Sequence, residues 1–353
     1  MAEARASLEA LMQLQDSTLG DFERELIHAK NDPSFAVADA IQALPRTAEP
    51  GRLTRQDFLF LFLNGLGQTR NSRATKLLMD ATDHLRAEGF PAEILETGPF
   101  ASTQANARMI LPQLRAKLSP ASTKHVVIVA ISKGTHDLVE ALAMNADQPT
   151  LSPTELGKID FVVSISGIVR RSAVASWLVR PKGLLPRLVR AFMQAPLIGK
   201  FPDLDGIQSL TTDPWDHLLA RGGARGLRCT WLSYAVLPDG QNGHPKTGFL
   251  RTRLLRGLRG SSKEIGPYDG LTESASSVLP PGTGLEQWIV RVRGAHGVIN
   301  GKYLDGTPVV APRSGVSAAV EIIEPLLRCL PTSHLDREPG GNDVELAAAS
   351  PLR

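Results

Sequence analysis

One serine stands at the junction of an apolar run and a helical segment, a context suited to a nucleophile. Ser132 lies in Ala-Ile-Ser-Lys-Gly (130–134), directly after the apolar residues 124–131 and before a helical pattern that extends to about Met144. A tight strand-to-helix turn with small residues on both sides lifts such a hydroxyl above a sheet, and the helix start offers free N–H groups. Serine is also a good N-cap residue, so helix capping is the alternative role.

A glycine-rich turn ends an earlier apolar run. The segment Asp-Phe-Leu-Phe-Leu-Phe-Leu (57–63) is followed by Asn-Gly-Leu-Gly (64–67). A continuous apolar run bounded by turn residues is typical of a strand buried on both faces, and a doubly wound sheet opens toward ligand at such strand ends. An ordinary strand-to-helix turn is the alternative. A P-loop fits less well, because its Lys-Ser/Thr ending is missing.

These two motifs resemble the α/β-hydrolase family, and within it the bacterial lipase and esterase branch that lacks the first strands of the full fold. The resemblance covers roughly residues 57–168 and 226–330. It implies an α/β-hydrolase fold in which Ser132 is the nucleophile. It also implies that the backbone N–H groups of Leu66 and Lys133 form an oxyanion hole.

Chain order in that family, serine then acid then histidine, implies that the other catalytic groups come late in the chain. His296 follows the apolar residues 287–292 by a few positions and fits the base. Asp269, in Pro-Tyr-Asp-Gly-Leu, resembles the segment that carries the acid in bacterial lipases. Asp239 follows the preceding strand more closely and stays the alternative, and an Asp-Gly pair is also a common turn. The catalytic set Ser132, Asp269 and His296 implies acyl transfer without a metal or an organic cofactor.

The elements that must position these residues alternate along the chain. Strands are predicted at 57–63, 92–97, 124–131, 160–165, 228–236 and 287–292. Helices are predicted at about 74–88, 105–118, 132–144 and 316–330. Strands that alternate with helices indicate a mainly parallel central sheet flanked by helices.

The domain organisation is predicted from where the alternation of strands and helices stops. We expect an N-terminal helical extension (1–50), a core (51–167 and 226–331), a helical lid insertion (168–225) and a disordered tail (332–353). Within the lid, basic residues alternate with apolar ones and no acidic residue occurs between Arg170 and Lys200. Such a segment can line an acyl-chain site or make transient contact with a lipid surface, and simple packing as a cap is the alternative.

Composition excludes several classes of protein. A formal net charge of +3 and 5% aromatic residues argue against a nucleic-acid partner, because neither a polycation nor a base-stacking platform is present. Two cysteines cannot form a disulfide framework. No apolar run reaches the roughly 18 residues that span a bilayer, and the N-terminus lacks the apolar stretch of a secretory signal, so a cytoplasmic location is favoured.

Three functional hypotheses remain open from the sequence. The first is a carboxylic-ester hydrolase, an esterase or lipase, acting on a small-molecule acyl ester. The second keeps the triad in a thioesterase, polyester depolymerase or amidase. The third is a non-catalytic binding protein of the same fold, because Ala130 and Asn64 stand where the elbow and the turn commonly have glycine and histidine.

Overall fold

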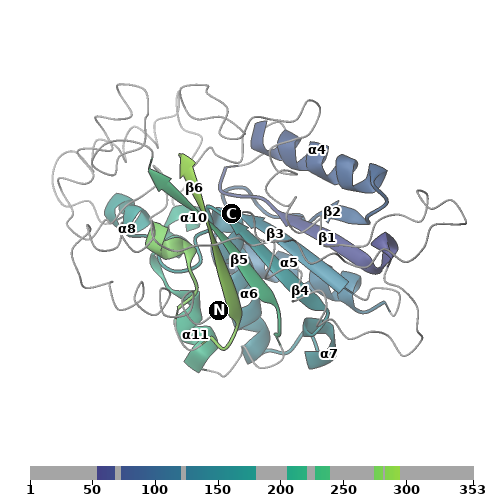
Figure 1. Cartoon of the computed structure of the whole chain (residues 1–353). Coiled ribbons are helices and arrows are strands. Elements are labelled where there is room, and N and C mark those ends of the chain that lie inside the picture. The colour runs from purple at the N-terminus through teal and green to yellow at the C-terminus, as the bar shows by residue number, and fades with distance from the viewer. Residues whose placement is uncertain are drawn as a thin grey trace, which may run out of the picture.

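A single parallel sheet forms the centre of the computed structural model (Figure 1). The structure describes residues 54–67, 73–120, 125–179, 205–220, 227–238, 274–280 and 283–294. Within these ranges the sheet has six strands, which are β1 (Phe58–Leu63), β2 (Ala92–Ile94), β3 (His125–Ile131), β4 (Ile159–Ile165), β5 (Thr230–Pro238) and β6 (Glu286–Gly294). Their order is β2-β1-β3-β4-β5-β6, and every neighbouring pair is parallel. All carboxyl ends therefore meet at one edge of the sheet.

Helices cover both faces of this sheet. The described helices are α4 (Arg73–Ala87), α5 (Thr103–Leu118), α6 (Lys133–Asp147), α7 (Pro153–Leu156), α8 (Ala173–Val179), α10 (Asp205–Gln208) and α11 (Pro214–Ala220). Short 3-10 turns occur at η2 (Arg55–Asp57), η3 (Ser209–Thr211) and η5 (Ser274–Ser277). Helix α6 contacts α5 and α11 on one face, whereas α4 covers the other (Figure 1). The predicted parallel sheet flanked by helices is confirmed.

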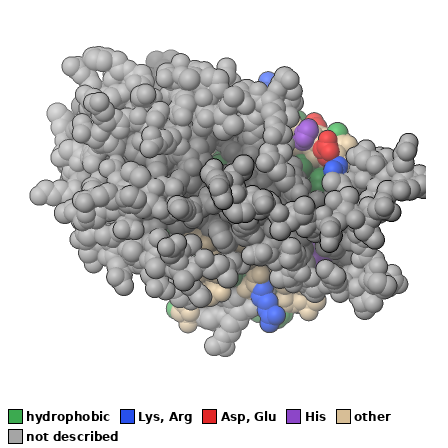
Figure 2. Space-filling model, viewed as in Figure 1, with side chains coloured by type: hydrophobic (Ala, Val, Ile, Leu, Met, Phe, Trp, Pro, Cys, Tyr) green, Lys and Arg blue, Asp and Glu red, His purple; other side chains and the backbone are tan. Residues whose placement is uncertain are grey.

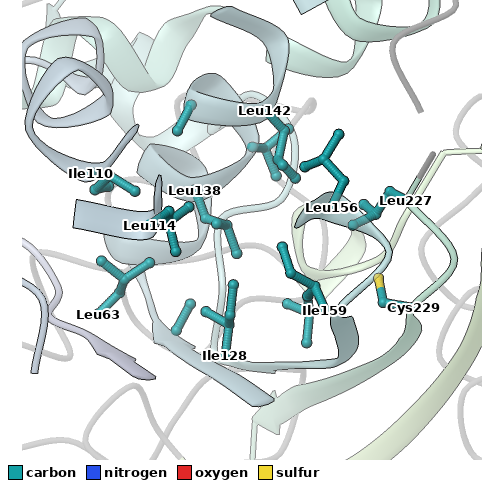
Figure 3. Packing of buried hydrophobic residues seen from close by; sticks show 14 of the residues in the cluster. Leu63, Ile110, Leu114, Ile128, Leu138, Leu142, Leu156, Ile159, Leu227 and Cys229 are labelled. Carbon is teal, nitrogen blue, oxygen red and sulfur yellow. The ribbon is translucent and has the colours of Figure 1, made fainter. Parts of the chain in front are cut away.

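Strand β1 shows why the predicted apolar runs make buried strands. All of its side chains are buried, and successive ones point to opposite faces. Leu63 joins the core cluster with Ile110 of α5 and Leu138 of α6, as Figure 3 shows. On the other face, the ring of Phe60 meets that of Phe90 edge to face, with centroids 5.5 Å apart. The side chains of β1 therefore pack into the core on both faces of the sheet.

Helix α4 is amphipathic, as a helix that covers one face of a sheet must be. Leu78 and Leu85 are fully buried, whereas Asp80 and Asp83 are exposed. The space-filling view shows acidic, basic and histidine side chains together over this part of the surface (Figure 2). The charged side of α4 therefore faces solvent.

The end of the predicted lid insertion packs on the core. Helix α11 lies within it, and the Trp215 side chain is fully buried there against Trp231 of β5, with ring centroids 6.0 Å apart. Leu218 belongs to the same core cluster. Residues 205–220 belong to the connection from β4 to β5, and α11 within this connection packs on the core. The N-terminal extension (1–50), residues 180–204 and the tail (332–353) lie outside the described residues.

The predicted boundaries that fall within the described residues agree with the structure to within three residues, and the helix predicted at 316–330 lies outside the described residues. The strand predicted at 92–97 ends at Ile94, after which the chain follows an irregular path to Ser102. Leu95 N donates to Phe62 O, which is the last ladder contact before the chain leaves the sheet. Among the described helices, none is both long and apolar enough to cross a membrane.

Candidate active site

Ser132 occupies a strained turn between β3 and α6. Its backbone has φ 51° and ψ −121°, a combination that non-glycine residues rarely adopt. Its N–H donates to Ile165 O at 3.0 Å, and its carbonyl accepts from Thr135 N at 3.1 Å and from Ile168 N at 3.0 Å. These hydrogen bonds from both sides hold the strained backbone of Ser132 in place.

The alternative role of Ser132 as a helix cap is not supported by this geometry. An N-cap residue has an extended backbone and its side-chain oxygen accepts from the second or third helical N–H. Ser132 has neither the extended backbone nor a side-chain capping hydrogen bond. Ser132 therefore does not have the geometry of a helix N-cap.

The first turn of α6 touches the end of β1. A Cβ atom on Gly134 would lie 2.5 Å from Asn64 O and 3.0 Å from Leu63 O, both backbone atoms that cannot move freely. The small residue predicted two positions after Ser132 is therefore required by this close approach. The same contact brings the glycine-rich turn 64–67 beside the start of α6.

The two segments expected to donate to an oxyanion are thus neighbours. Lys133 is the first residue of α6, so its N–H has no acceptor within the helix. Leu66 lies two residues beyond Asn64, and the next residue, Gly67, donates its N–H to Pro99 O at 2.7 Å. The structure places both turns at the carboxyl edge of the sheet, next to Ser132.

The side chain of Lys133 turns into the protein. Its Nζ lies 2.6 Å and 2.8 Å from the two carboxylate oxygens of Asp137, and both side chains are buried. Burial raises the pKa of Asp137 to about 6, although the Lys133 charge acts in the opposite direction. Because its ammonium is bound by this carboxylate, Lys133 is not available as a base for Ser132.

His136, which also lies on α6, is an unsuitable base. Its ring is completely buried, and burial, together with the Lys133 charge, lowers its pKa to about 4. A buried, neutral imidazole at this depth cannot reach a substrate that approaches the carboxyl edge. The buried polar cluster beside His136 was not predicted, although the spacing of four residues between Lys133 and Asp137 could have indicated an ion pair on one face of the helix.

The predicted acid and base, Asp269 and His296, lie outside the described residues, as does the alternative acid Asp239. The strands that lead to two of them are described. Pro238 at the end of β5 pairs in register with Gly294 at the end of β6. Asp239 and His296 follow these two strand ends by one and two residues.

The segment that follows Asp269 is anchored beside the loop after β4. Ser276 O accepts from Val169 N at 2.7 Å and from Arg170 N at 3.2 Å. The Ser276 hydroxyl donates to Arg171 O at 2.9 Å. The residue before Val169 is Ile168, whose N–H donates to Ser132 O, so η5 lies one loop away from the serine turn. Within the described ranges, no group of three or more His, Cys, Asp or Glu side chains could hold a metal ion.

Comparison with known proteins gives the fold a name. No protein-family model and no curated protein matches the chain. Among solved structures, it is similar to the metagenomic carboxyl esterase MGS0156, with 20% identity, 81% of this chain and 82% of that chain covered, and a TM-score of 0.50. Lipase BlEst2 from Bacillus licheniformis matches with 17% identity, 65% and 84% coverage, and a TM-score of 0.43. From its strand order, its serine turn and the first of these likenesses, the chain has the α/β-hydrolase fold.

Proposed function

We propose that the protein is a serine hydrolase that cleaves carboxylic esters through an acyl-enzyme on Ser132. The observation that carries this proposal is the backbone of Ser132, held at φ 51° and ψ −121° where a parallel strand meets a helix. This strain has a cost in stability and serves no capping role, whereas a nucleophile needs it in order to stand above the sheet. The similar structure at TM-score 0.50 is named a carboxyl esterase, which supports the same reaction class.

The remaining roles follow from the order of the residues along the chain. His296 takes the proton from Ser132 as the oxygen attacks the ester carbonyl, and Asp269 orients the imidazole and stabilises its charged form. The N–H groups of Leu66 and Lys133 hold the negative oxygen of the tetrahedral intermediate. The alcohol leaves with the proton from His296, and water then releases the acyl group by the reverse sequence.

Asp269 is favoured over Asp239 by the anchoring of η5. Ser274 lies five residues after Asp269, and a chain of five residues reaches at most roughly 17 Å. The hydrogen bonds of Ser276 to residues 169–171 keep this segment near the loop that contacts Ser132. Asp239 follows β5 directly and is the matched alternative for mutation.

An apolar cluster beside the serine turn suggests where the acyl chain binds. The cluster contains Ile168, Ala175, Ile207 and Leu210, and the half-buried side chain of Leu66 packs against it. Ile168 also donates its N–H to Ser132 O, which ties the cluster to the nucleophile. We infer that acyl esters of moderate to long chain are preferred. Contact of the segment 168–225 with a lipid surface is part of the same proposal.

The test is steady-state hydrolysis of p-nitrophenyl esters of graded chain length, beside a matched thioester and a matched anilide. Ser132→Ala and His296→Gln should lower kcat by at least about 1,000-fold, since members of a triad act as a unit. Asp269→Asn should act similarly, whereas Asp239→Asn should retain activity. A preference for the thioester would indicate a thioesterase, and a preference for the anilide would indicate an amidase.

A control excludes misfolding as the cause of lost activity. All variants are purified alongside the wild type, and their circular dichroism spectra must match that of the wild type. Ester hydrolysis that persists in Ser132→Ala would remove the serine from the reaction. Loss of activity in Asp239→Asn with normal activity in Asp269→Asn would assign the role of catalytic acid to Asp239 instead of Asp269.

A further inference from the structure

A chain of buried polar contacts starts at the side chain of Lys133, the residue after the proposed nucleophile. The Lys133 ammonium bridges both oxygens of Asp137, and each side chain is only 1% exposed. The amide of Asn106, on α5, donates to the same carboxylate at 2.7 Å. Asn106 is itself buried. Three polar groups are thus held together between α5 and α6.

The contact chain continues from Asn106 to the glycine-rich turn. Its Oδ1 accepts from Gly98 N at 2.8 Å, and its Nδ2 lies 3.2 Å from Gly98 O. The next residue, Pro99, accepts at its carbonyl from Gly67 N at 2.7 Å. The start of α6 and the turn 64–67 are therefore linked by hydrogen bonds that pass through side chains, in addition to the direct contact at Gly134.

Stability alone does not explain why these buried side chains are charged or polar. Taking an ammonium and a carboxylate out of water costs several kcal/mol per ion, and apolar residues of similar volume often give equal stability. An apolar pair at positions 133 and 137 would pack between the helices equally well. An apolar pair cannot fix the orientation of the Asn106 side chain, because only a carboxylate at position 137 accepts a hydrogen bond from the Asn106 amide.

We propose that the Lys133 side chain, together with Asp137 and Asn106, is a positioning device that sets the separation between the backbone N–H groups of Lys133 and Leu66. This inference rests on the proposed function, because it gives these two groups the oxyanion. Each donor must lie about 2.7–3.1 Å from the oxyanion, so a small shift of either turn weakens transition-state binding. Binding of the ground-state ester depends on the apolar cluster and is unaffected.

The test compares kcat and KM in a double variant, Lys133→Met with Asp137→Leu. Changing both partners leaves no charge buried without its counterpart, so the fold should be retained. We expect kcat to fall by about 10- to 100-fold, less than the loss of a whole oxyanion donor, with KM within about twofold of the wild type. A role in folding alone would lower the melting temperature and leave kcat per folded molecule unchanged.

A buried pair at the opposite edge of the sheet gives the matched control. His125 Nδ1 lies 3.0 Å from Asp160 Oδ2, and these side chains are 5% and 10% exposed. The double variant His125→Phe with Asp160→Leu removes a largely buried pair, slightly more exposed than Lys133–Asp137, at the amino ends of β3 and β4. Its kcat and KM should equal those of the wild type, whatever happens to its melting temperature.

A second variant keeps the proposal testable if the first does not fold. Asn106→Leu leaves the Lys133–Asp137 pair in place and removes the hydrogen bonds of Asn106 to Asp137 and to Gly98. It should also lower kcat with little change in KM. Wild-type kcat in either folded variant would overturn the positioning role. A wild-type enzyme that hydrolyses no ester would instead overturn the proposed function, and the two failures are therefore distinct.

Discussion

Glycine at position 132 should give a more stable protein than alanine at the same position, which reverses the usual order of these two residues. Ser132 has φ 51° and ψ −121°, outside the regions that L-residues populate readily. Such a backbone costs about 1–3 kcal/mol in any residue with a Cβ, and glycine avoids this cost. In an ordinary position glycine is instead less favourable than alanine by about 0.5–1 kcal/mol, because the unfolded chain is freer.

The expected difference in the free energy of unfolding is the relief of backbone strain minus the added entropy cost of glycine. Both variants lack the serine hydroxyl, so the loss of its contacts cancels when they are compared with each other. Relief of strain exceeds the added entropy cost, and the free energy of unfolding should favour Ser132→Gly over Ser132→Ala by about 1 kcal/mol. Both proteins should be inactive.

Urea unfolding followed by circular dichroism measures this difference directly. Ala116, an exposed residue within α5, supplies the control, since Ala116→Gly should cost about 1 kcal/mol in a regular helix. If Ser132→Ala were as stable as Ser132→Gly, the turn would not be strained. The argument that the strain marks a nucleophile would then fail.

Two further predictions concern the helix that follows the serine. Gly134→Ala places a Cβ 2.5 Å from Asn64 O and should lower both kcat and the free energy of unfolding, the latter by about 1–3 kcal/mol. In the control Gly157→Ala the nearest contact is longer, at 3.3 Å from Pro153 O, so its loss in urea unfolding should be clearly smaller. The pKa of His136 falls from 6.5 to about 4, so the unfolded chain binds the proton more tightly and stability is lost as the pH falls from 6.5 towards 4. Between pH 7 and pH 4.5 this loss is about 2–3 kcal/mol, and His136→Leu should remove it from the urea unfolding curves. Equal losses in His136→Leu and the wild type would assign the acid sensitivity to other groups.

The strands and the serine turn could be predicted because their signals are local. A continuous apolar run such as 57–63 is long enough for a buried strand, and Ser132 stands where such a run meets a helical pattern. The six predicted strands all exist, and the sheet is parallel as expected. Local periodicity suffices here because both faces of the sheet are covered.

The contacts between distant segments could not be predicted in this way. The Lys133–Asp137 pair has helical spacing, but its partner Asn106 lies on another helix, and nothing in the sequence brings them together. Burial of Trp215 against β5 likewise depends on how the chain returns from β4. The acid and base stay predictions from family resemblance, because they lie outside the described residues.

The central claim is that Ser132 is an activated nucleophile, and covalent labelling tests it most directly. The folded protein is incubated with a fluorophosphonate probe, beside Ser132→Ala and a heat-denatured sample, with detergent present to expose the site. Peptide mass spectrometry then locates the label. The account predicts a label on Ser132 in the folded wild type alone. A folded wild type without label, or a label that persists in Ser132→Ala, would contradict it and favour a non-catalytic protein with this fold.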